Sequence, residues 1–206
     1  MAEPAPPVIA RLAERQLVTK FGTWHEILYH NGLTESFALV YGEVAGKAGV
    51  PCRIHSACLS AHVFNSIECD CREQMEIAQT MIQKLGDGII IWLDQEGRGN
   101  GHLALMLAAK LSTELGIPQS EAYRRLGYGV DERRYLAASA ILRDLDVASV
   151  RLISNSPAKS DALTSDGIEV IDMLPVAVDL TDYPQLRSYY ADKAARGHAF
   201  PDSRGG

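Results

Sequence analysis

The chain has 206 residues, of which 47% are hydrophobic and 22% charged, with a formal net charge of −6 and an isoelectric point near 5.5. These values suit one globular domain with a substantial core, and the acidic balance argues against a protein that coats nucleic acid. No apolar run approaches the roughly 18 residues of a membrane span, and the start does not resemble a signal peptide. We therefore expect a cytoplasmic protein with residues 1–9 disordered and residues 10–206 forming a single domain.

Strand patterns dominate the first quarter of the chain. Val18–Tyr29 mixes β-branched and aromatic residues, and Phe37–Val44 and Val50–His55 are predicted strands. A helix is predicted over Gln74–Leu85, where apolar residues recur at helical spacing before a glycine. It would begin directly after Cys71, so its positive N-terminal dipole would lie beside the thiols there.

Three of the four cysteines, Cys58, Cys69 and Cys71, fall within fourteen residues. This density is typical of zinc sites, and three protein ligands leave a fourth coordination position open, as in catalytic centres. Zinc there would lower the pKa of a bound water to near neutrality. The alternative is that the cysteines are core residues, but a packed strand would seldom bury both residues of a Cys-x-Cys pair on one side. We expect Cys52 in the core instead.

The central part of the chain predicts an anion-binding loop. Gly88–Leu93 is continuously apolar, as in a buried strand, and a helix is predicted over Leu103–Leu115. The glycine-rich loop between them meets the start of that helix, which is a favourable place for phosphate. It is neither a Walker A loop nor a dinucleotide fingerprint. Glu96 and Arg98, directly after an apolar strand, favour a functional site over a plain loop.

The second half of the chain alternates helices and strands, which predicts an α/β fold with a mixed sheet covered by helices. A helix is expected to begin at Asp131 and to direct Leu136, Ala140, Ile141 and Leu145 inward. The charges at its start, taken alone, look like a solvated first turn. The other expected elements are a helix over 118–126, a strand over 150–153, a polar loop over 154–159 and a last strand over 167–173.

Six motifs in this order resemble those of GTP cyclohydrolase II, the zinc enzyme that opens the guanine ring at the start of riboflavin synthesis. They are Ala38-Leu39-Val40-Tyr41-Gly42, Arg53-Ile54-His55-Ser56-Ala57-Cys58, Cys69-Asp70-Cys71, Gln95-Glu96-Gly97-Arg98, Leu126-Gly127-Tyr128 with Asp131 and Arg133, and Ser154-Asn155-Ser156-Pro157-Ala158-Lys159. The resemblance runs from about Leu17 to Phe200 and includes a closing Gly197-His198.

The resemblance implies a GTP cyclohydrolase II-like catalytic domain, Zn²⁺ held by the three clustered cysteines, and Mg²⁺ when a triphosphate is bound. Asp131 matches the proton-handling carboxylate, and Arg133 matches the arginine proposed to attack the α-phosphate while pyrophosphate leaves. This reverses the interpretation of both residues as part of a solvated turn. The remaining matches are nucleotide-binding positions: Arg53, Gln74, Glu96, Arg98, Ser154 and Lys159. The resemblance further implies a homodimer that binds a small nucleotide or nucleobase. The acidic charge and the lack of a long apolar run, not the resemblance, predict no nucleic acid or membrane partner.

The chain departs from the family pattern around one stretch. Ala57 and Gln119 stand where the family has glutamate and threonine. The family run Asn-Lys-x-Arg-Ala-Tyr, whose tyrosine is catalytic, corresponds to 103–110 here, and its tyrosine falls on Ala109 or Lys110. Asn100 and His102 replace residues that are usually apolar. We take Asn100, His102 and Lys110 as candidate substrate contacts.

Because the zinc cysteines, Asp131 and Arg133 remain, we infer a working hydrolytic centre with altered substrate handling. The leading hypothesis is conversion of GTP to a formamido- or diaminopyrimidine product, with release of formate and pyrophosphate. Without the tyrosine the reaction would stop at the formamide, and each missing cationic side chain would weaken binding by about 1.5–3 kcal/mol. An alternative is ring opening of uracil, uridine or UMP in pyrimidine degradation, which suits the apolar helix at 103–109. A second alternative is a non-catalytic nucleotide-binding regulator.

Overall fold

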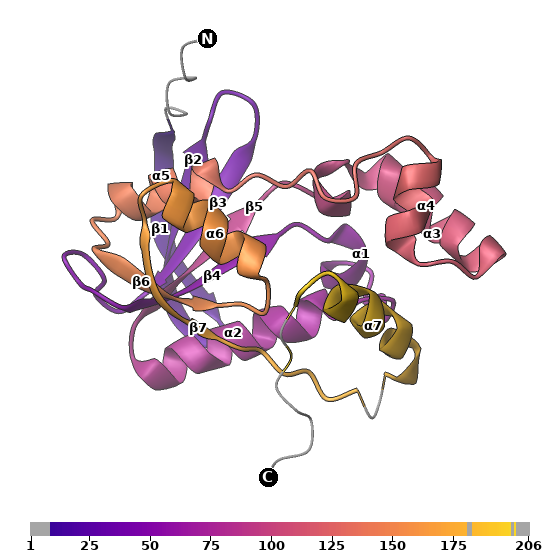
Figure 1. The fold of residues 1–206 in the computed structure, drawn as a ribbon. Coiled ribbons are helices and arrows are strands. Elements are labelled where there is room, and N and C mark those ends of the chain that lie inside the picture. Colours follow the sequence, from indigo (N-terminus) through magenta and orange to yellow (C-terminus); the bar gives the residue numbers. More distant parts are fainter. Residues whose placement is uncertain (1–8, 181–182, 199, 201–206) are drawn as a thin grey trace.

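A computed structural model describes residues 9–180, 183–198 and 200 (Figure 1). One seven-stranded sheet has the order β1-β2-β3-β5-β4-β6-β7. The strands are β1 Ala10–Thr19, β2 Gly22–His30, β3 Glu35–Tyr41, β4 Val50–Ser56, β5 Gly88–Leu93, β6 Ser149–Ile153 and β7 Glu169–Leu174. The first three strands and β5 pair antiparallel, whereas β5, β4, β6 and β7 pair parallel. The predicted mixed sheet is confirmed.

Helices cover both faces of the sheet (Figure 1). They are α1 Leu59–His62, α2 Cys71–Leu85, α3 His102–Leu115, α4 Gln119–Arg125, α5 Leu136–Asp144, α6 Pro157–Ser165 and α7 Arg187–Ala195, with 3₁₀ turns η1 Gly97–Gly99 and η2 Pro184–Leu186. Alternate residues of β5 face opposite sides of the sheet. Ile90 accordingly packs with Ile82 of α2, whereas Ile91 belongs to the cluster that contains Leu142 of α5. The central strand is therefore buried on both faces, as its apolar run predicted.

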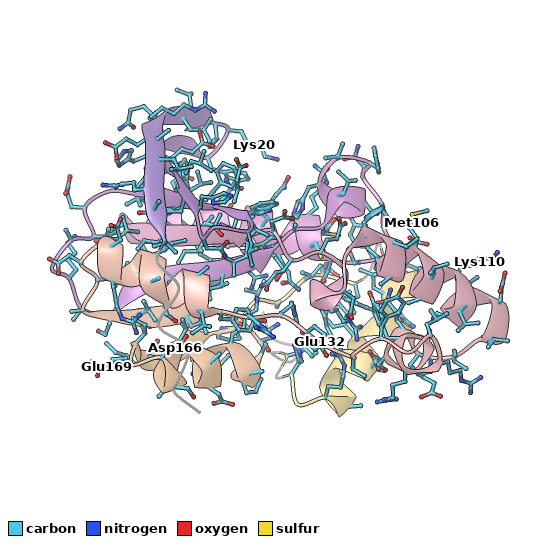
Figure 2. All side chains as sticks on the ribbon, turned by 90° about the horizontal axis from the view of Figure 1, so that it is seen from above. Lys20, Met106, Lys110, Glu132, Asp166 and Glu169 are labelled. Atoms are coloured by element: carbon cyan, nitrogen blue, oxygen red, sulfur yellow. The ribbon has the colours of Figure 1, made fainter. Side chains whose placement is uncertain are left out.

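Helices α3 and α4 pack on each other beside the sheet. Their own small core consists of Ala104, Ala108, Ala122 and Tyr123, all at most 1% exposed. Seen from above, Met106 and Lys110 lie along α3 at a distance from the strands (Figure 2). The pair of helices thus forms a wall at the end of the sheet where β4 and β5 deliver the sequence motifs.

The helix predicted from Asp131 begins only at Leu136, so the expected start is wrong. The preceding residues form a loop whose backbone is held elsewhere, because the amide of Glu132 donates to the carbonyl of Arg98 at 2.8 Å. Leu136 is 44% exposed rather than buried, while Ile141 and Leu145 pack inward as expected. Helix α7 was not predicted, because its sequence lacks an apolar stripe.

The proline-rich start predicted to be disordered lies mostly outside the described residues. Ile9, which was assigned to it, packs against the main core. Within the described part of the chain, no helix is both long and apolar enough to cross a membrane.

Candidate active site

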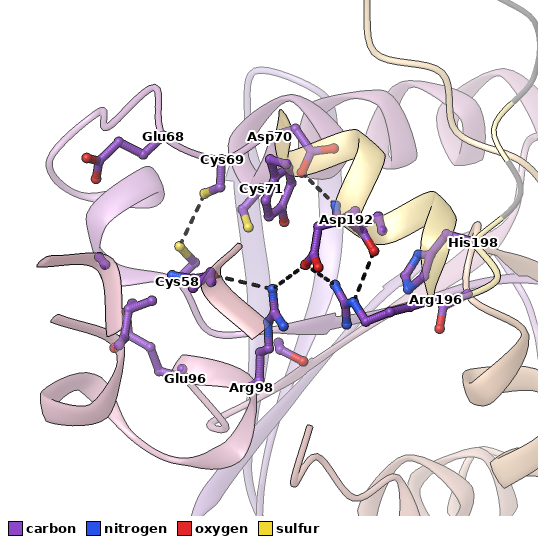
Figure 3. Close-up of a pocket in the computed structure, with 18 of the residues that line it drawn as sticks. Cys58, Glu68, Cys69, Asp70, Cys71, Glu96, Arg98, Asp192, Arg196 and His198 are labelled. Carbon is purple, nitrogen blue, oxygen red and sulfur yellow. Dashed lines mark hydrogen bonds and ion pairs between the residues drawn. The ribbon is translucent and has the colours of Figure 1, made fainter. Parts of the chain in front are cut away.

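The three clustered cysteines meet in space. The Sγ atoms of Cys58, Cys69 and Cys71 all lie within 4.8 Å of one another, and those of Cys58 and Cys69 are 3.7 Å apart (Figure 3). Sulfurs bound tetrahedrally to one zinc at about 2.3 Å are separated by about 3.8 Å, whereas disulfide sulfurs are about 2.05 Å apart. The sulfur positions therefore fit a shared metal ion. Cys52 is fully buried among the core residues, which confirms the prediction for it.

Two loops bring the sulfurs together. Cys58 follows β4, and the next amide, that of Leu59, donates to the Glu96 carboxylate at 2.8 Å. Cys71 is the first residue of α2, and Cys69 precedes it by two positions. Cys69 and Cys71 thus lie at a helix N-terminus rather than on a strand. The free amide groups of a helix N-terminus favour thiolates.

The thiols compete for protons. Hydrogen bonds from Cys69 and Cys71 lower the pKa of the Cys58 thiol, and hydrogen bonding to Cys58 raises the pKa of Cys71. One negative charge on the cluster thus disfavours the next. A divalent cation would remove this conflict, because metal binding requires deprotonated thiols. The donor set fits zinc chemically as well as geometrically.

A cavity of about 980 Å³ opens beside the sulfurs. Although the whole chain is acidic, the cavity wall is rich in cations: Arg53, Arg98, Arg133, Lys159, Lys193 and Arg196. Such a volume is at the upper end of small-molecule sites, and clustered cations suit a phosphate-bearing ligand. The predicted residues Gln74, Glu96 and Ser154 also line this cavity.

Arg53 and Gln74 form a buried polar chain. Arg53 is 4% exposed and donates to the carbonyl of Ile153 at 3.0 Å and to Gln74 Oε1 at 2.5 Å. Gln74 in turn donates to Asp70, which is fully buried and 3.1 Å from Lys193 of α7. Burial raises the pKa of Asp70. The charge of Lys193 and the hydrogen bonds that Asp70 accepts outweigh that effect and hold the pKa of Asp70 below its usual range. These hydrogen bonds and the ion pair hold the Arg53 side chain in place in the cavity wall.

Ser154 lies in the short loop after β6, and Lys159 lies in the first turn of α6, so the polar loop predicted over 154–159 ends at Ser156. Lys159 is 6% exposed and donates from Nζ to the carbonyl of Ile54 at 2.7 Å. Burial lowers its pKa, and Arg53 and Arg133 nearby lower it further. Ser154 accepts a hydrogen bond from the amide of Ser156 at 3.1 Å. An anion bound nearby would therefore stabilise the protonated form of Lys159.

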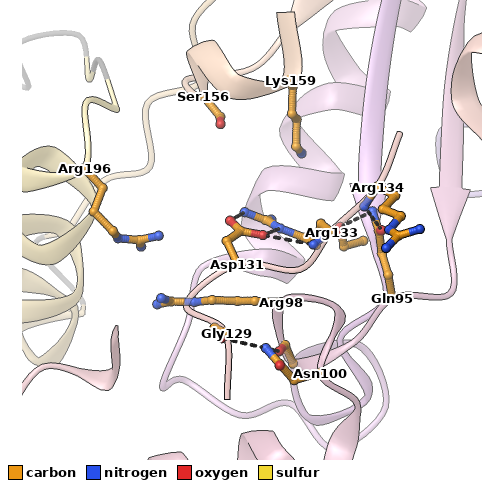
Figure 4. Close-up of polar contacts among 12 residues, drawn as sticks. Gln95, Arg98, Asn100, Gly129, Asp131, Arg133, Arg134, Ser156, Lys159 and Arg196 are labelled. Atoms are coloured by element: carbon orange, nitrogen blue, oxygen red, sulfur yellow. Dashed lines mark hydrogen bonds and ion pairs between the residues drawn. The ribbon is translucent and has the colours of Figure 1, made fainter. Parts of the chain in front are cut away.

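Asp131 and Arg133 form a bidentate ion pair, with Arg133 Nε at 2.8 Å and Nη2 at 2.5 Å from the carboxylate (Figure 4). Burial raises the pKa of Asp131, but Arg133 outweighs burial and keeps it below the ordinary value. Arg133 lines the cavity, whereas Asp131 is not among the residues that line it. Both side chains are therefore ionised at neutral pH, and the carboxylate lies directly against the guanidinium.

The glycine loop docks against this pair. Arg98 adopts φ +58, a conformation that non-glycine residues seldom take outside functional sites. A Cβ on Gly99 would lie 2.7 Å from the backbone carbon of Glu132. Only glycine permits this approach, which brings Arg98 next to the Asp131 loop. Gln95 adds a second clamp, because its Oε1 accepts from the amide of Arg134 at 3.0 Å.

The structure does not bring the other candidate contacts into the cavity wall. Lys110 has a side chain that is 73% exposed and lies 3.8 Å from Glu114. The ring of His102 lies 3.1 Å from Glu96, and Asn100 donates to the carbonyls of Gly97 and Gly129. These are contacts that shape the loop. Ala109, the other candidate for the tyrosine position, does line the cavity.

Helix α7 contributes residues that sequence reasoning missed. Asp192 lies 3.5 Å from Arg98 and accepts a hydrogen bond from Ser120 at 2.6 Å. Tyr190 donates to Asp70 at 2.5 Å. The one signal in the sequence was a mixture of aromatic and charged residues before Gly197-His198. His198 also lines the cavity, and its amide closes the final turn on Lys193.

Comparison with known proteins identifies the family. The profile of GTP cyclohydrolase II matches residues 10–175. The chain is 38% identical over 194 residues to riboflavin biosynthesis protein RibBA of Bacillus cereus, which covers 93% of this chain and 48% of the relative. It is 35% identical over 199 residues to GTP cyclohydrolase-2 of Xylella fastidiosa, covering 92% of this chain and 49% of the relative.

Among solved structures, RibBX, a two domain 3,4-dihydroxy-2-butanone 4-phosphate synthase from A. baumannii, matches with a TM-score of 0.46 and 21% identity over 83% of this chain and 40% of that one. The chain spans about half the length of the curated relatives it matches. The profile match covers most of its described residues. The chain belongs to the GTP cyclohydrolase II family.

Proposed function

We propose that this chain is a zinc-dependent hydrolase that opens the ring of GTP, in riboflavin biosynthesis. The observation that carries the proposal is the convergence of the three-sulfur cluster and the cationic wall on one cavity. A ring-opening hydrolase acting on a nucleotide needs both, one for the base and one for the phosphates. Zinc, when bound by the cysteines, supplies an activated water.

The chain's own side chains position the substrate and move protons. Arg53, Arg98 and Lys159 would hold the phosphates, because charged hydrogen bonds to phosphate are strong. Arg133 is always protonated in water, so an attack by it on phosphorus needs a base. Asp131 is bonded to it through two nitrogens and can accept that proton. Magnesium would accompany a triphosphate.

The side chain at position 109 bears on whether the reaction goes beyond the first hydrolysis. Of the two residues that could correspond to the family's catalytic tyrosine, Ala109 is the one on the cavity wall, and it carries only a methyl group. Without that hydroxyl we expect hydrolysis to stop at the formamidopyrimidine, with pyrophosphate but little formate released.

A second candidate is ring opening of uracil, uridine or UMP. It is favoured by the internal pairing of the cavity's cations, since Arg98 meets Asp192 and Arg133 meets Asp131. The apolar side chains of Leu105 and Met106 in the same wall would also suit a less charged substrate.

The test is a product assay of the zinc-loaded protein with GTP, guanosine, UMP, uridine and uracil, followed by ultraviolet spectrum and product mass. A formamidopyrimidine or diaminopyrimidine from GTP supports the proposal. Ring opening of a uracil compound with GTP untouched replaces it with the second candidate. No turnover, together with unfolding of Cys69→Ser, would indicate a nucleotide-binding regulator with structural zinc.

We also propose a homodimer. Leu103, Met106 and Leu107 lie on one face of α3 and are 40–68% exposed, and large exposed apolar side chains in one region mark association surfaces. Light scattering coupled to size-exclusion chromatography distinguishes 22.5 kDa from twice that mass.

A further inference from the structure

Two residues of the cavity wall carry a buried hydrogen-bond donor that has no partner among the described residues. The donors are the hydroxyl of Tyr123 and Nη1 of Arg98, and both residues line the cavity. Tyr123 is fully buried. Buried hydrogen-bond donors nearly always have an acceptor in folded proteins. Two such donors without one, both on residues of a cavity wall, point to an acceptor on a bound ligand.

The position of Tyr123 is built by neighbouring small residues. Its ring packs with Ala104 and Ala108, one helical turn apart on α3, and these leave a slot for it. Its hydroxyl reaches the glycine loop, where a Cβ on Gly97 would be 3.6 Å from Oη. Because Gly97 has no side chain, the hydroxyl meets the loop unobstructed.

The ring also positions Arg98. The guanidinium carbon of Arg98 lies 5.6 Å from the ring centroid of Tyr123, within the range of a cation–π contact. Figure 4 shows Arg98 extended toward Arg196, near Asp131 and Arg133. The Tyr123 ring therefore packs against one of the cations that line the cavity.

We propose that the Tyr123 hydroxyl, together with Arg98, donates a hydrogen bond to a phosphoryl oxygen of the substrate, and that its ring holds Arg98 in place for this contact. Burial raises the pKa of Tyr123, so the phenol stays protonated and acts as a donor. The inference rests on the proposed function only in taking the substrate to be a nucleotide.

Tyr123→Phe removes the hydroxyl and keeps the ring. We expect the Kd of GTP with magnesium, and that of inorganic triphosphate, to rise about tenfold in calorimetric titrations, with guanosine binding unchanged. The melting temperature should stay the same or rise, because the substitution removes an unpaired buried hydroxyl. Tyr123→Leu also removes the ring, and it should weaken triphosphate binding further.

Tyr29→Phe is the matched control. Tyr29 is also fully buried, but its hydroxyl donates to Asp144 at 2.7 Å and lies outside this cavity. Its removal should lower the melting temperature and leave the Kd of triphosphate unchanged.

The inference is overturned if Tyr123→Phe binds triphosphate as the wild type does, or if it loses thermal stability as Tyr29→Phe does without a change in Kd. Equal weakening of guanosine and GTP would place the contact on the nucleoside and overturn the phosphoryl assignment. Inorganic triphosphate keeps this test separate from the proposed function, since its binding can be measured even if GTP is not hydrolysed.

Discussion

The carboxylate of Asp192 lies 3.5 Å from the guanidinium of Arg98, and both side chains are 12% exposed. Arg196 approaches the same carboxylate at 3.3 Å (Figure 3). A carboxylate from α7 therefore occupies a place between two cations that a phosphate would otherwise take. If the substrate is the nucleotide proposed above, its phosphates would have to compete with this carboxylate and would be repelled by its charge.

Asp192→Asn should tighten binding of phosphate-bearing ligands. Removing the negative charge frees Arg98, and the gain should be roughly three- to tenfold in Kd, as for a partly screened charge pair. The amide oxygen still accepts from Ser120, so α7 should stay docked. Calorimetry with inorganic triphosphate measures the effect. Asp87→Asn is the control, because it breaks the surface pair with Lys47 outside the cavity and should change nothing. Weaker binding by Asp192→Asn would contradict the competition.

Cys69→Ser should abolish stoichiometric zinc binding. The purified wild type is expected to hold about one zinc per chain, because the three sulfurs match the ligand geometry of that ion. Elemental analysis after dialysis measures the content. Cys52→Ala, in the core and outside the cluster, should keep its zinc. Equal loss of metal from both variants would mean that the cluster is not the site.

Asp131→Asn should lower kcat by about 100-fold or more while zinc content stays unchanged, because general acid–base groups contribute that much. Asparagine keeps the size of the side chain but cannot take a proton from Arg133. Asp172→Asn is matched to it, since Asp172 binds Arg151 in a similar pair on the sheet surface. Activity of Asp131→Asn within threefold of the wild type would remove Asp131 from the mechanism.

Ala109→Tyr should shift the product from the formamide toward the diaminopyrimidine with formate. The added phenol would extend from α3 into the cavity, which Ala109 lines. Lys110→Tyr is the control, because that side chain points to solvent and its substitution should leave the product unchanged. Liquid chromatography with mass detection distinguishes the two products. If Lys110→Tyr alone released formate, the assignment of the tyrosine position to Ala109 would be wrong.

The sheet and the clustering of the three cysteines could be predicted because their signals are local. The apolar run at Gly88–Leu93 specifies a buried strand, and the cysteine spacing specifies a ligand set. Helical geometry directs Ala109 to the cavity and Lys110 to solvent, which favours Ala109 as the tyrosine position.

Long-range relationships had no such signal. The loop around Asp131 is not helical, because its backbone bonds to the Arg98 loop more than thirty residues away in the sequence. The pairing of Asp192 with Arg98 joins segments still further apart. Neither composition nor periodicity records which distant charges meet, so α7 was missed.

The lowered pKa of His198 predicts that the free energy of unfolding decreases in mild acid. Burial, with Lys193 and Arg196 nearby, lowers the pKa of His198 to about 4, against about 6.5 in an unfolded chain. The unfolded state then binds more protons below pH 6.5, so the stabilisation by neutral His198 is complete above that value and is lost as pH falls toward 4.

His198→Asn removes the titrating group. In urea unfolding of the zinc-loaded protein between pH 7.5 and 5, the free energy of unfolding should fall less steeply for this variant than for the wild type. His30→Asn tests a histidine at the end of β2 that does not line the cavity, and it should follow the wild-type slope. Parallel curves for the wild type and His198→Asn would mean that His198 has an ordinary pKa in the folded protein.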